Sequence, residues 1–501
     1  MLGMHFGRVP RPSAAEDEAA EKNLPYPQRD TDDWLQLINR ASIVSNIEAG
    51  LLDRENGRRL AQALDIMREE AKQPGAKRAE LYITFEPEML KRAGLAASIV
   101  HVGRSSQDIL ATANLGLNLE RLNKLLFALT EVRRALLELA RREEGALVPS
   151  YTNGVQAQPT LYSHYLLAQD AIFARDCERV LQCIDRYDTC PMGSGVCNGT
   201  GWPLPTARMA ELLGFKRTFV NAFDAGQCQG NDVPLEISQI ISSAMLHVNA
   251  FLADFMIQYA TPRPWIHLTG TNGVYRSSAM PQKRNPGLIN DCRRDAGLVL
   301  GEAAGVAVRV QNLSLGMADV RDVHCMQALC DDACVTLRTF AGIVGRLAVD
   351  RVRSLEELNA DWTCTQEIAD QLVRLCGVDF RTGHSFASHL VTWARAKGVT
   401  PPALAYEDAA AVWRDFRQDP KFSSAPAELP MTPEALRRAL DPQGIVEERA
   451  TPGSANPAFV KAMLADAFQA LEADEQAAQS LVKARAEAAS KLDEALAAAV
   501  A

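Results

Sequence analysis

Apolar residues recur three and four positions apart along most of this chain, which is the spacing of one face of an α-helix. Runs that alternate Val, Ile or Thr with polar residues between turn signals are scarce, so few strands are expected. The longest helical patterns contain no internal proline except Pro234, and helices of that length pack side by side as an elongated bundle. The pattern therefore predicts an all-α fold whose long central helices lie at 106–143, 160–186, 231–260 and 287–312.

The segments outside these helices differ in composition. Residues 1 to about 30 show no steady period and are typical of an extended arm, whereas the Pro-rich segment 418–435 is typical of a surface insertion. The connecting loops hold most of the Gly, Pro, Asn and Thr, and chemistry is expected there. These loops are 145–159, 187–204, 218–232 and 262–286. Further helices are predicted at 364–376, 383–397 and 458–498.

A chain of this length is expected to form roughly two to four domains, and the pattern divides it into three helical regions. They are an N-terminal domain with the extended arm (1–110), a central long-helix bundle (111–363) and a C-terminal domain (364–501).

Composition and charge exclude several classes of protein. Of 501 residues, 47% are hydrophobic and 23% charged, which is ordinary for a globular chain, and the net charge of -9 argues against nucleic acid as a partner. No run of 18 apolar residues and no signal-type N-terminus is present, so we expect a cytoplasmic protein without a membrane partner. The eleven cysteines form no Cys-x-x-Cys pair, and no phosphate-binding loop is found, so no metal and no cofactor is expected.

The most informative segment is 275–291, which reads YRSSAMPQKRNPGLIND. Asn285 is a good N-cap and Pro286 suits the first position of a helix, so the loop is expected to end at a helix N-terminus. The positive end of that helix, beside the ammonium of Lys283, provides a place for a dianionic acid or a developing enediolate.

This segment resembles the signature of the aspartase/fumarase superfamily, Gly-Ser-Ser-x-Met-Pro-x-Lys-x-Asn-Pro, and departs from it only at Arg276, which replaces the glycine. The resemblance implies that Ser277 is the general base that removes a proton next to a carboxylate. It implies that Lys283 stabilises the resulting aci-carboxylate and that Asn285 orients the substrate. Ser278 and Met280 belong to the same motif and are candidate substrate contacts.

A second segment, 101–114, is similar to the first active-site block of that superfamily, in which Gly-Arg-Ser leads into a long helix. Either of two serines suits the N-cap of the helix. The resemblance implies that polar side chains here bind a substrate carboxylate: Arg104, Ser105, Ser106 and Gln107. The Ser-Gln-Asp order at 106–108 is closer to carboxymuconate cycloisomerases than to argininosuccinate lyases.

A third segment, 151–165, resembles the block Tyr-Thr-His-Leu-Gln-x-Ala-Gln-Pro, with Thr152 and Gln158 in place as candidate substrate contacts. Asn153 stands where the family has the histidine linked to protonating the leaving group. Asparagine orients a substrate but delivers no proton at neutral pH. His101 and His164 are the nearest alternatives in the sequence.

The resemblance extends over nearly all of the chain from about residue 40, and the segments 193–215, 364–391 and 440–460 are similar to argininosuccinate lyases. It fails at 317–322, where that family holds the arginine half of its substrate. Arg276 and Arg321 add positive charge instead, which suggests that the amine portion of the substrate carries a carboxylate.

The resemblance implies a three-domain helical lyase that forms a homotetramer, with each active site shared between subunits. We predict a cofactor-independent carbon–nitrogen lyase that cleaves a small acidic metabolite, an N-succinyl-type amino acid or aminopolycarboxylate, to fumarate and an amine through an aci-carboxylate. Three alternatives remain open: argininosuccinate lyase itself, a carboxymuconate-type cycloisomerase, and a non-catalytic protein on the same fold.

Overall fold

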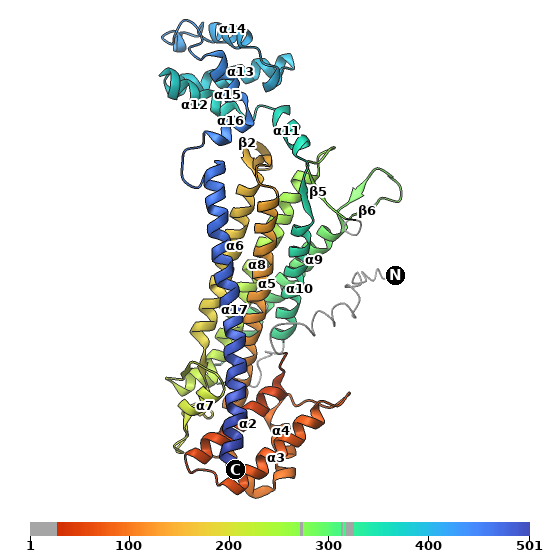
Figure 1. Cartoon of the computed structure of the whole chain (residues 1–501), viewed down its shortest axis with the longest axis vertical. Coiled ribbons are helices and arrows are strands. Elements are labelled where there is room, and N and C mark those ends of the chain that lie inside the picture. The colour runs from red at the N-terminus through yellow and green to blue at the C-terminus, as the bar shows by residue number, and fades with distance from the viewer. Residues whose placement is uncertain (1–27, 271–273, 312–313, 317–324) are drawn as a thin grey trace.

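The computed structural model describes residues 28–270, 274–311, 314–316 and 325–501. Helices dominate it, and the molecule is elongated, with the long helices running lengthwise (Figure 1). The principal helices are α2 (Thr31–Glu48), α3 (Arg54–Ala71), α4 (Tyr82–Ala93), α5 (Ser106–Arg142), α6 (Tyr162–Tyr187), α7 (Thr206–Leu212), α8 (Gln229–Tyr259), α9 (Gly287–Val310), α10 (Cys325–Gly345), α11 (Arg351–Ala360), α12 (Thr365–Cys376), α13 (Phe380–Lys397), α14 (Tyr406–Phe416), α15 (Pro433–Leu440), α16 (Pro442–Glu447) and α17 (Pro457–Val500). The predicted all-α fold class is confirmed.

The central bundle consists of α5, α6, α8, α9 and α10, packed against one another along their lengths. Helix α5 has 37 residues, and a capping box fixes its start: the Ser105 hydroxyl accepts from the backbone at the first turn, while Asp108 accepts from the backbone N–H of Ser105. It is buried over most of its length because other bundle helices and α17 cover it. The four predicted central helices agree with α5, α6, α8 and α9 to within a few residues.

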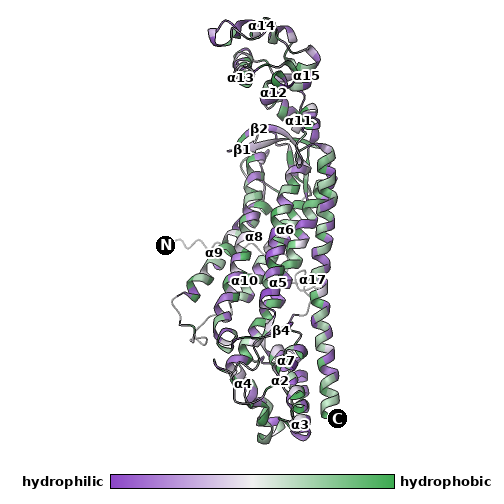
Figure 2. Ribbon diagram, turned by 90° about the vertical axis from the view of Figure 1, so that its left-hand side faces the viewer, coloured by the Kyte–Doolittle hydropathy of each residue, from purple (hydrophilic) through white to green (hydrophobic). Residues whose placement is uncertain are grey.

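Helix α17 crosses the whole molecule. It begins near the α12–α16 cluster and runs back along α5 and α6 to α2 and α3, as Figures 1 and 2 show from two directions. Buried apolar side chains accordingly form two clusters. One joins α2–α10 with α17, and the other lies within Trp362–Ile445. In the proposed three-domain division, α17 belongs to the C-terminal domain by sequence. Its buried side chains nevertheless complete the hydrophobic core of the N-terminal and central domains.

The stretch Asp224–Tyr259 is long and apolar enough to cross a membrane by length and composition alone. It comprises the short π-helix η2 (Asp224–Cys228) and α8, and it packs against α5, α6, α9 and α10. These contacts place it inside the helical bundle.

Strands are short but more numerous than the sequence pattern indicated. In the described part of the chain they pair as four two-stranded sheets. One is the hairpin of β1 (Leu147–Thr152) and β2 (Val155–Leu161), so the prediction of an irregular loop at 145–159 was wrong. Asn153 (φ 51°) and Gly154 (φ 77°) occupy its two-residue turn, and Asn-Gly is the pair that such a turn favours. Another pairs β5 (Ile266–Leu268) with β8 (Leu347–Val349).

A buried ion cluster joins three helices in the middle of the bundle. Arg133 of α5 is 1% exposed and forms hydrogen bonds through Nε and Nη2 to the carboxylate of Asp170 on α6, at 2.9 and 3.2 Å. Its Nη1 binds Asp474 of α17. The guanidinium thus ties α17 to the bundle while it satisfies a carboxylate that is itself buried.

Arg133→Ala is therefore expected to lower the free energy of unfolding by roughly 3–5 kcal/mol, because Asp170 would remain buried without its cation. The neighbouring Arg134 provides a matched control, since it also binds α17, through Glu475 at 2.9 Å, but its side chain is 43% exposed. Arg134→Ala should cost no more than about 1 kcal/mol. Urea denaturation followed by circular dichroism measures both, and equal losses would contradict this assignment.

Candidate active site

The signature segment forms a small hairpin that projects from the bundle beside the start of α9 (Figure 1). Its strands are β6 (Tyr275–Arg276) and β7 (Arg284–Asn285). Asn285 pairs with Tyr275 and so has extended backbone, and α9 begins at Gly287 with Pro286, not Asn285, as its N-cap. The prediction that Asn285 caps α9 was wrong because strand pairing takes up this residue.

The loop of this hairpin holds Ser277 in a defined position. The backbone N–H of Met280 donates to Ser277 Oγ at 3.2 Å, and the Ser277 N–H donates to the carbonyl of Lys283 at 3.3 Å. A donor aimed at Oγ favours the ionised form of a hydroxyl. The Lys283 side chain is exposed and has no ion-pair partner in the described part of the chain. Ser278 and Met280 are exposed beside it.

The same hairpin carries two arginines directly opposite each other, since Arg276 pairs with Arg284 across the strands. Both side chains are exposed, and Arg284 Nη1 donates to the carbonyl of Pro281 at 2.6 Å. Like charges at opposed positions destabilise a two-stranded ribbon unless an anion lies between them. Together with Lys283 they give this hairpin a positive surface suited to an acidic ligand.

The first block lies at the N-terminus of α5, where Ser105 is the N-cap and accepts from the Gln107 N–H at 3.3 Å. Arg104 is buried, and its guanidinium already donates to Asn39 Oδ1 (3.1 Å), Ser42 Oγ (3.0 Å) and the Tyr82 hydroxyl (2.9 Å). These hydrogen bonds link α2 and α4 to the loop that precedes α5.

Ser106 and Gln107 line a cavity of about 410 Å³ formed with α4, the rest of α5 and the start of α8. Tyr82 is also in its wall, and burial raises the pKa of this tyrosine to about 12, so its hydroxyl remains protonated. Of the four predicted contacts in this block, these two therefore face open space, whereas Arg104 is held inside the chain.

Sequence reasoning missed a polar cluster behind this block. His101 Nδ1 lies 3.1 Å from Glu86 Oε1, its ring stacks on Tyr82, and the hydrogen bond from His101 holds the pKa of Glu86 below its ordinary value. Glu86 and Tyr82 sit four residues apart on α4, but no motif marked them. His101 Nε2 has no hydrogen-bond partner among the residues described.

Asp108 connects the first block to the loop after α6. It is fully buried and accepts from the backbone N–H groups of Ser105 (2.8 Å), Gly193 (3.0 Å) and Gly195 (3.2 Å). Burial raises the pKa of this carboxyl, and the three donors partly offset that effect. Gly193 has φ 95°, in the left-handed region that glycine tolerates, which lets the loop turn its N–H groups inward.

The second active-site block, residues 151–165, begins on the β1–β2 hairpin. It lies at the opposite end of the bundle from the first block, residues 101–114. Thr152 and Asn153 are exposed at the tip of the hairpin, while the Gln158 side chain is hydrogen-bonded to Gln366 of α12. His164 Nε2 donates to the carbonyl of Gly453 at 3.0 Å, and its Nδ1 lies 3.4 Å from Thr160 Oγ1. Both ring nitrogens of His164 therefore have partners within the chain.

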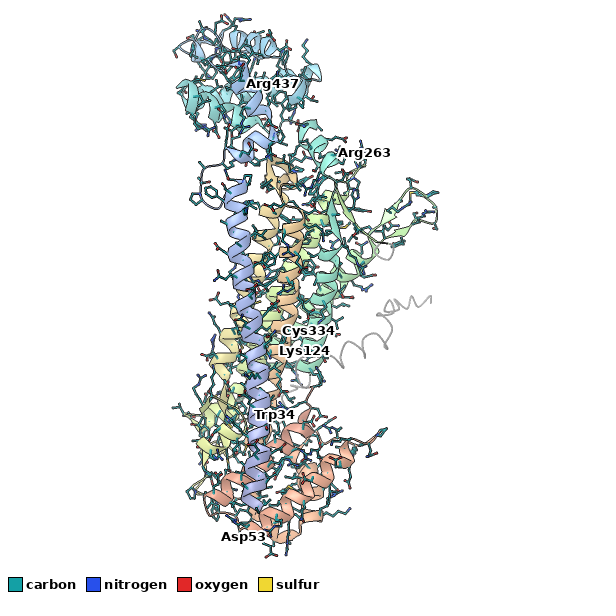
Figure 3. All side chains as sticks on the ribbon, viewed as in Figure 1. Trp34, Asp53, Lys124, Arg263, Cys334 and Arg437 are labelled. Carbon is teal, nitrogen blue, oxygen red and sulfur yellow. The ribbon has the colours of Figure 1, made fainter. Side chains whose placement is uncertain are left out.

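The three blocks do not meet within one chain. The first block precedes α5 and the second follows it, and 37 helical residues span roughly 55 Å at 1.5 Å per residue. Figure 3 shows the same separation: Trp34 and Asp53 mark the end near the first block, and Arg437 marks the α12–α16 cluster at the other end. Arg321 and the whole segment 317–322 lie outside the described residues.

Two family models and several known proteins are similar to this chain. Family models described as "Lyase" and "Argininosuccinate lyase C-terminal" match residues 15–301 and 362–447. The argininosuccinate lyase of Methanothrix thermoacetophila is 28% identical over 445 residues, which cover 87% of this chain and 88% of that protein.

Two solved structures show the fold alone, because their sequence identity is low. An EDDS lyase variant with bound fumarate superposes with a TM-score of 0.85 at 23% identity, covering 94% of this chain and 92% of that one. The 3-carboxy-cis,cis-muconate lactonizing enzyme from Pseudomonas putida gives 0.61 at 16% identity, with 87% and 94% covered.

The lyase model spans more than half of the chain, and the C-terminal model covers the α12–α16 cluster. The chain belongs to the aspartase/fumarase superfamily of lyases, in its argininosuccinate lyase-like branch.

Proposed function

We propose that this lyase breaks the carbon–nitrogen bond of an N-succinyl-type amino acid or aminopolycarboxylate and releases fumarate and an amine. The observation that carries the proposal is the β6–β7 hairpin, which holds the Ser277 hydroxyl among three exposed cations: Arg276, Lys283 and Arg284. A surface with this charge suits a polycarboxylate and the additional negative charge that develops during proton abstraction. The argininosuccinate lyase relatives support the same reaction class.

In the proposed reaction, Ser277 Oγ removes the proton from the carbon next to a substrate carboxylate. The electron pair of that C–H bond moves into the carboxylate, which becomes an aci-carboxylate with two negative oxygens. The pair then returns to form the carbon–carbon double bond of fumarate as the C–N bond breaks and the amine leaves. The Met280 N–H at 3.2 Å favours the Ser277 alkoxide, and the Lys283 ammonium stabilises the dianion.

The active site is proposed to form between subunits of a homotetramer. The length of α5 supports this, because it holds the first and second blocks at opposite ends of one chain. The exposed tip of the β1–β2 hairpin and the projecting β6–β7 hairpin also support it, since both present their polar residues outward. Substrate carboxylates would meet Ser106 and Gln107 of one subunit, Thr152 and Asn153 of a second, and Ser277 of a third.

His101 is the better candidate for protonating the leaving amine, because His164 is hydrogen-bonded through both ring nitrogens. His101 Nε2 instead has no hydrogen-bond partner in the described ranges, and Glu86 orients the ring through Nδ1. A histidine oriented by a carboxylate is a common general acid. Asn153 would orient the substrate without transferring a proton.

A cycloisomerase of the carboxymuconate type is the second candidate, favoured by Ser106-Gln107-Asp108. It would convert a muconate without forming fumarate. A non-catalytic protein on this fold would be stabilised against heat by dicarboxylates without converting them.

The first test incubates the purified protein with fumarate and a panel of amines that includes arginine, aspartate and diamines. We expect NMR to detect a new N-succinyl product, and Ser277→Ala should form it roughly 10²–10⁴-fold more slowly because the base is lost. Ser480→Ala, on the exposed face of α17, is the control and should keep the full rate. Wild-type activity in Ser277→Ala would disprove the assigned base.

Shared sites predict complementation between two inactive variants. Ser277→Ala and Gln107→Ala change different blocks, so co-expressed mixed tetramers should contain some sites with both native side chains. Random mixing would restore up to roughly a quarter of the native rate, because each native block is present with a chance of about one half. Activity that stays at the level of the separate variants would show that both blocks come from the same subunit.

A further inference from the structure

A second cavity, of about 420 Å³, lies beneath the β1–β2 hairpin, on the side away from its Asn-Gly turn. Its walls come from the hairpin, the first turns of α6, the end of α8, Trp265 and the loop between α16 and α17. This volume is in the range of small-molecule sites in proteins. Its wall includes Gln158, a candidate substrate contact, but the polar groups Asp254, Gln258, Arg449 and Ser454 have no part in the proposed reaction.

Two polar side chains in the wall have no hydrogen-bond partner among the described residues. Gln258 of α8 is 7% exposed and makes no hydrogen bond to the described residues, but its amide is not closed off from solvent. Ser454 Oγ is buried and has no partner either. Burying a hydroxyl without a partner costs free energy, so the unpaired Ser454 hydroxyl in the wall of this cavity points to a polar ligand there.

One carboxylate in the wall lacks a cation. Asp254 Oδ2 accepts a hydrogen bond from the Tyr165 hydroxyl at 3.0 Å, and no basic side chain in the described ranges forms an ion pair with it. Burial and the neighbouring carboxylate raise the pKa of Tyr165 well above its ordinary value, so this hydroxyl remains a donor. Asp254 is exposed to solvent, and its second carboxylate oxygen is open to a cationic group.

A cation in the wall has spare donors. Arg449 binds Glu367 Oε2 through Nη1 at 3.1 Å, and Arg374 already neutralises the same carboxylate at 2.9 Å. The other guanidinium nitrogens of Arg449 have no partner in the part of the chain that is described. A guanidinium with free donors beside the Ser454 hydroxyl suits a ligand carboxylate.

The rest of the wall is aromatic and apolar. Tyr162 stacks on Tyr165 with ring centroids 5.9 Å apart and meets the edge of Trp265 at 5.9 Å. Ile257, Pro149 and Ala168 also line the cavity. Such walls favour a hydrocarbon side chain, and the faces of tyrosine rings also attract an ammonium group.

We propose that this cavity binds a free amino acid with an apolar side chain. Its ammonium group lies at Asp254, its carboxylate at Arg449 and Ser454, and its side chain among the aromatic rings. Gln258 supplies an amide to the same ligand. Because Tyr151 and Gln158 of the hairpin are also in the wall, the bound amino acid contacts the element that carries Thr152 and Asn153. The inference is independent of the proposed reaction.

Isothermal titration calorimetry with L-phenylalanine and L-leucine tests the site on the full-length protein. We expect saturable binding of both. 2-Phenylethylamine and 3-phenylpropionate, which each lack one charged group, should bind at least about tenfold more weakly, because each loses a charge-assisted hydrogen bond. Fumarate should not compete, since it has no ammonium group and no apolar side chain.

Variants separate the two ends of the ligand. Asp254→Asn should weaken L-phenylalanine at least about tenfold while leaving 3-phenylpropionate unchanged, and Arg449→Gln should weaken L-phenylalanine while leaving 2-phenylethylamine unchanged. Asp466→Asn and Arg54→Gln, exposed and remote from the cavity, are the matched controls, with circular dichroism to show that each variant is folded. Absence of binding at millimolar amino acid, or equal affinity in both cavity variants and controls, overturns the proposal.

Discussion

The length of α5 is the constraint on which the rest of this molecule depends. Its 37 residues run through the centre of the bundle, so that α6, α10 and α17 all pack against it, and it ends in the hairpin that carries the second block. A rigid helix of that length cannot bend its two ends together. The same packing that stabilises the bundle therefore prevents one chain from assembling its own site, and association of chains becomes a requirement of the proposed chemistry.

Charge is distributed differently in the interior and on the hairpins. Inside, cations and carboxylates neutralise one another, as Arg133 does with Asp170 and Asp474, and the two terminal nitrogens of Arg104 donate to neutral oxygens. On the β6–β7 hairpin, Arg276, Lys283 and Arg284 face outward without carboxylate partners among the described residues. An uncompensated positive surface is unfavourable in isolation and becomes favourable when an acidic ligand occupies it.

The position of Asn153 is set by the backbone of a tight turn and is also the place where the superfamily motif has a proton donor. Its φ of 51° is in the left-handed region, where asparagine is tolerated better than most side chains, and Gly154 completes the turn. Local backbone geometry alone is thus sufficient to explain the residue. Because asparagine donates no proton, the proposed acid is a histidine elsewhere in the chain. Glu86 orients His101, whereas His164 is hydrogen-bonded to Gly453, so His101 is the better candidate.

The sequence by itself determined the helical class, the positions of α5, α6, α8 and α9, and the family, because helical periodicity and the Ser-Ser-x-Met-Pro-x-Lys motif are local properties of the chain. It located Ser277, Lys283, Ser106 and Gln107 as candidates for the same reason. Only the tertiary structure decided that Arg104 is enclosed by Asn39, Ser42 and Tyr82, that Glu86 orients His101, and that α17 completes the core of α2–α10. These facts depend on contacts between segments distant in sequence, which neither period nor motif encodes. The strands other than β1 and β2 are only two or three residues long, which leaves too little pattern to predict them.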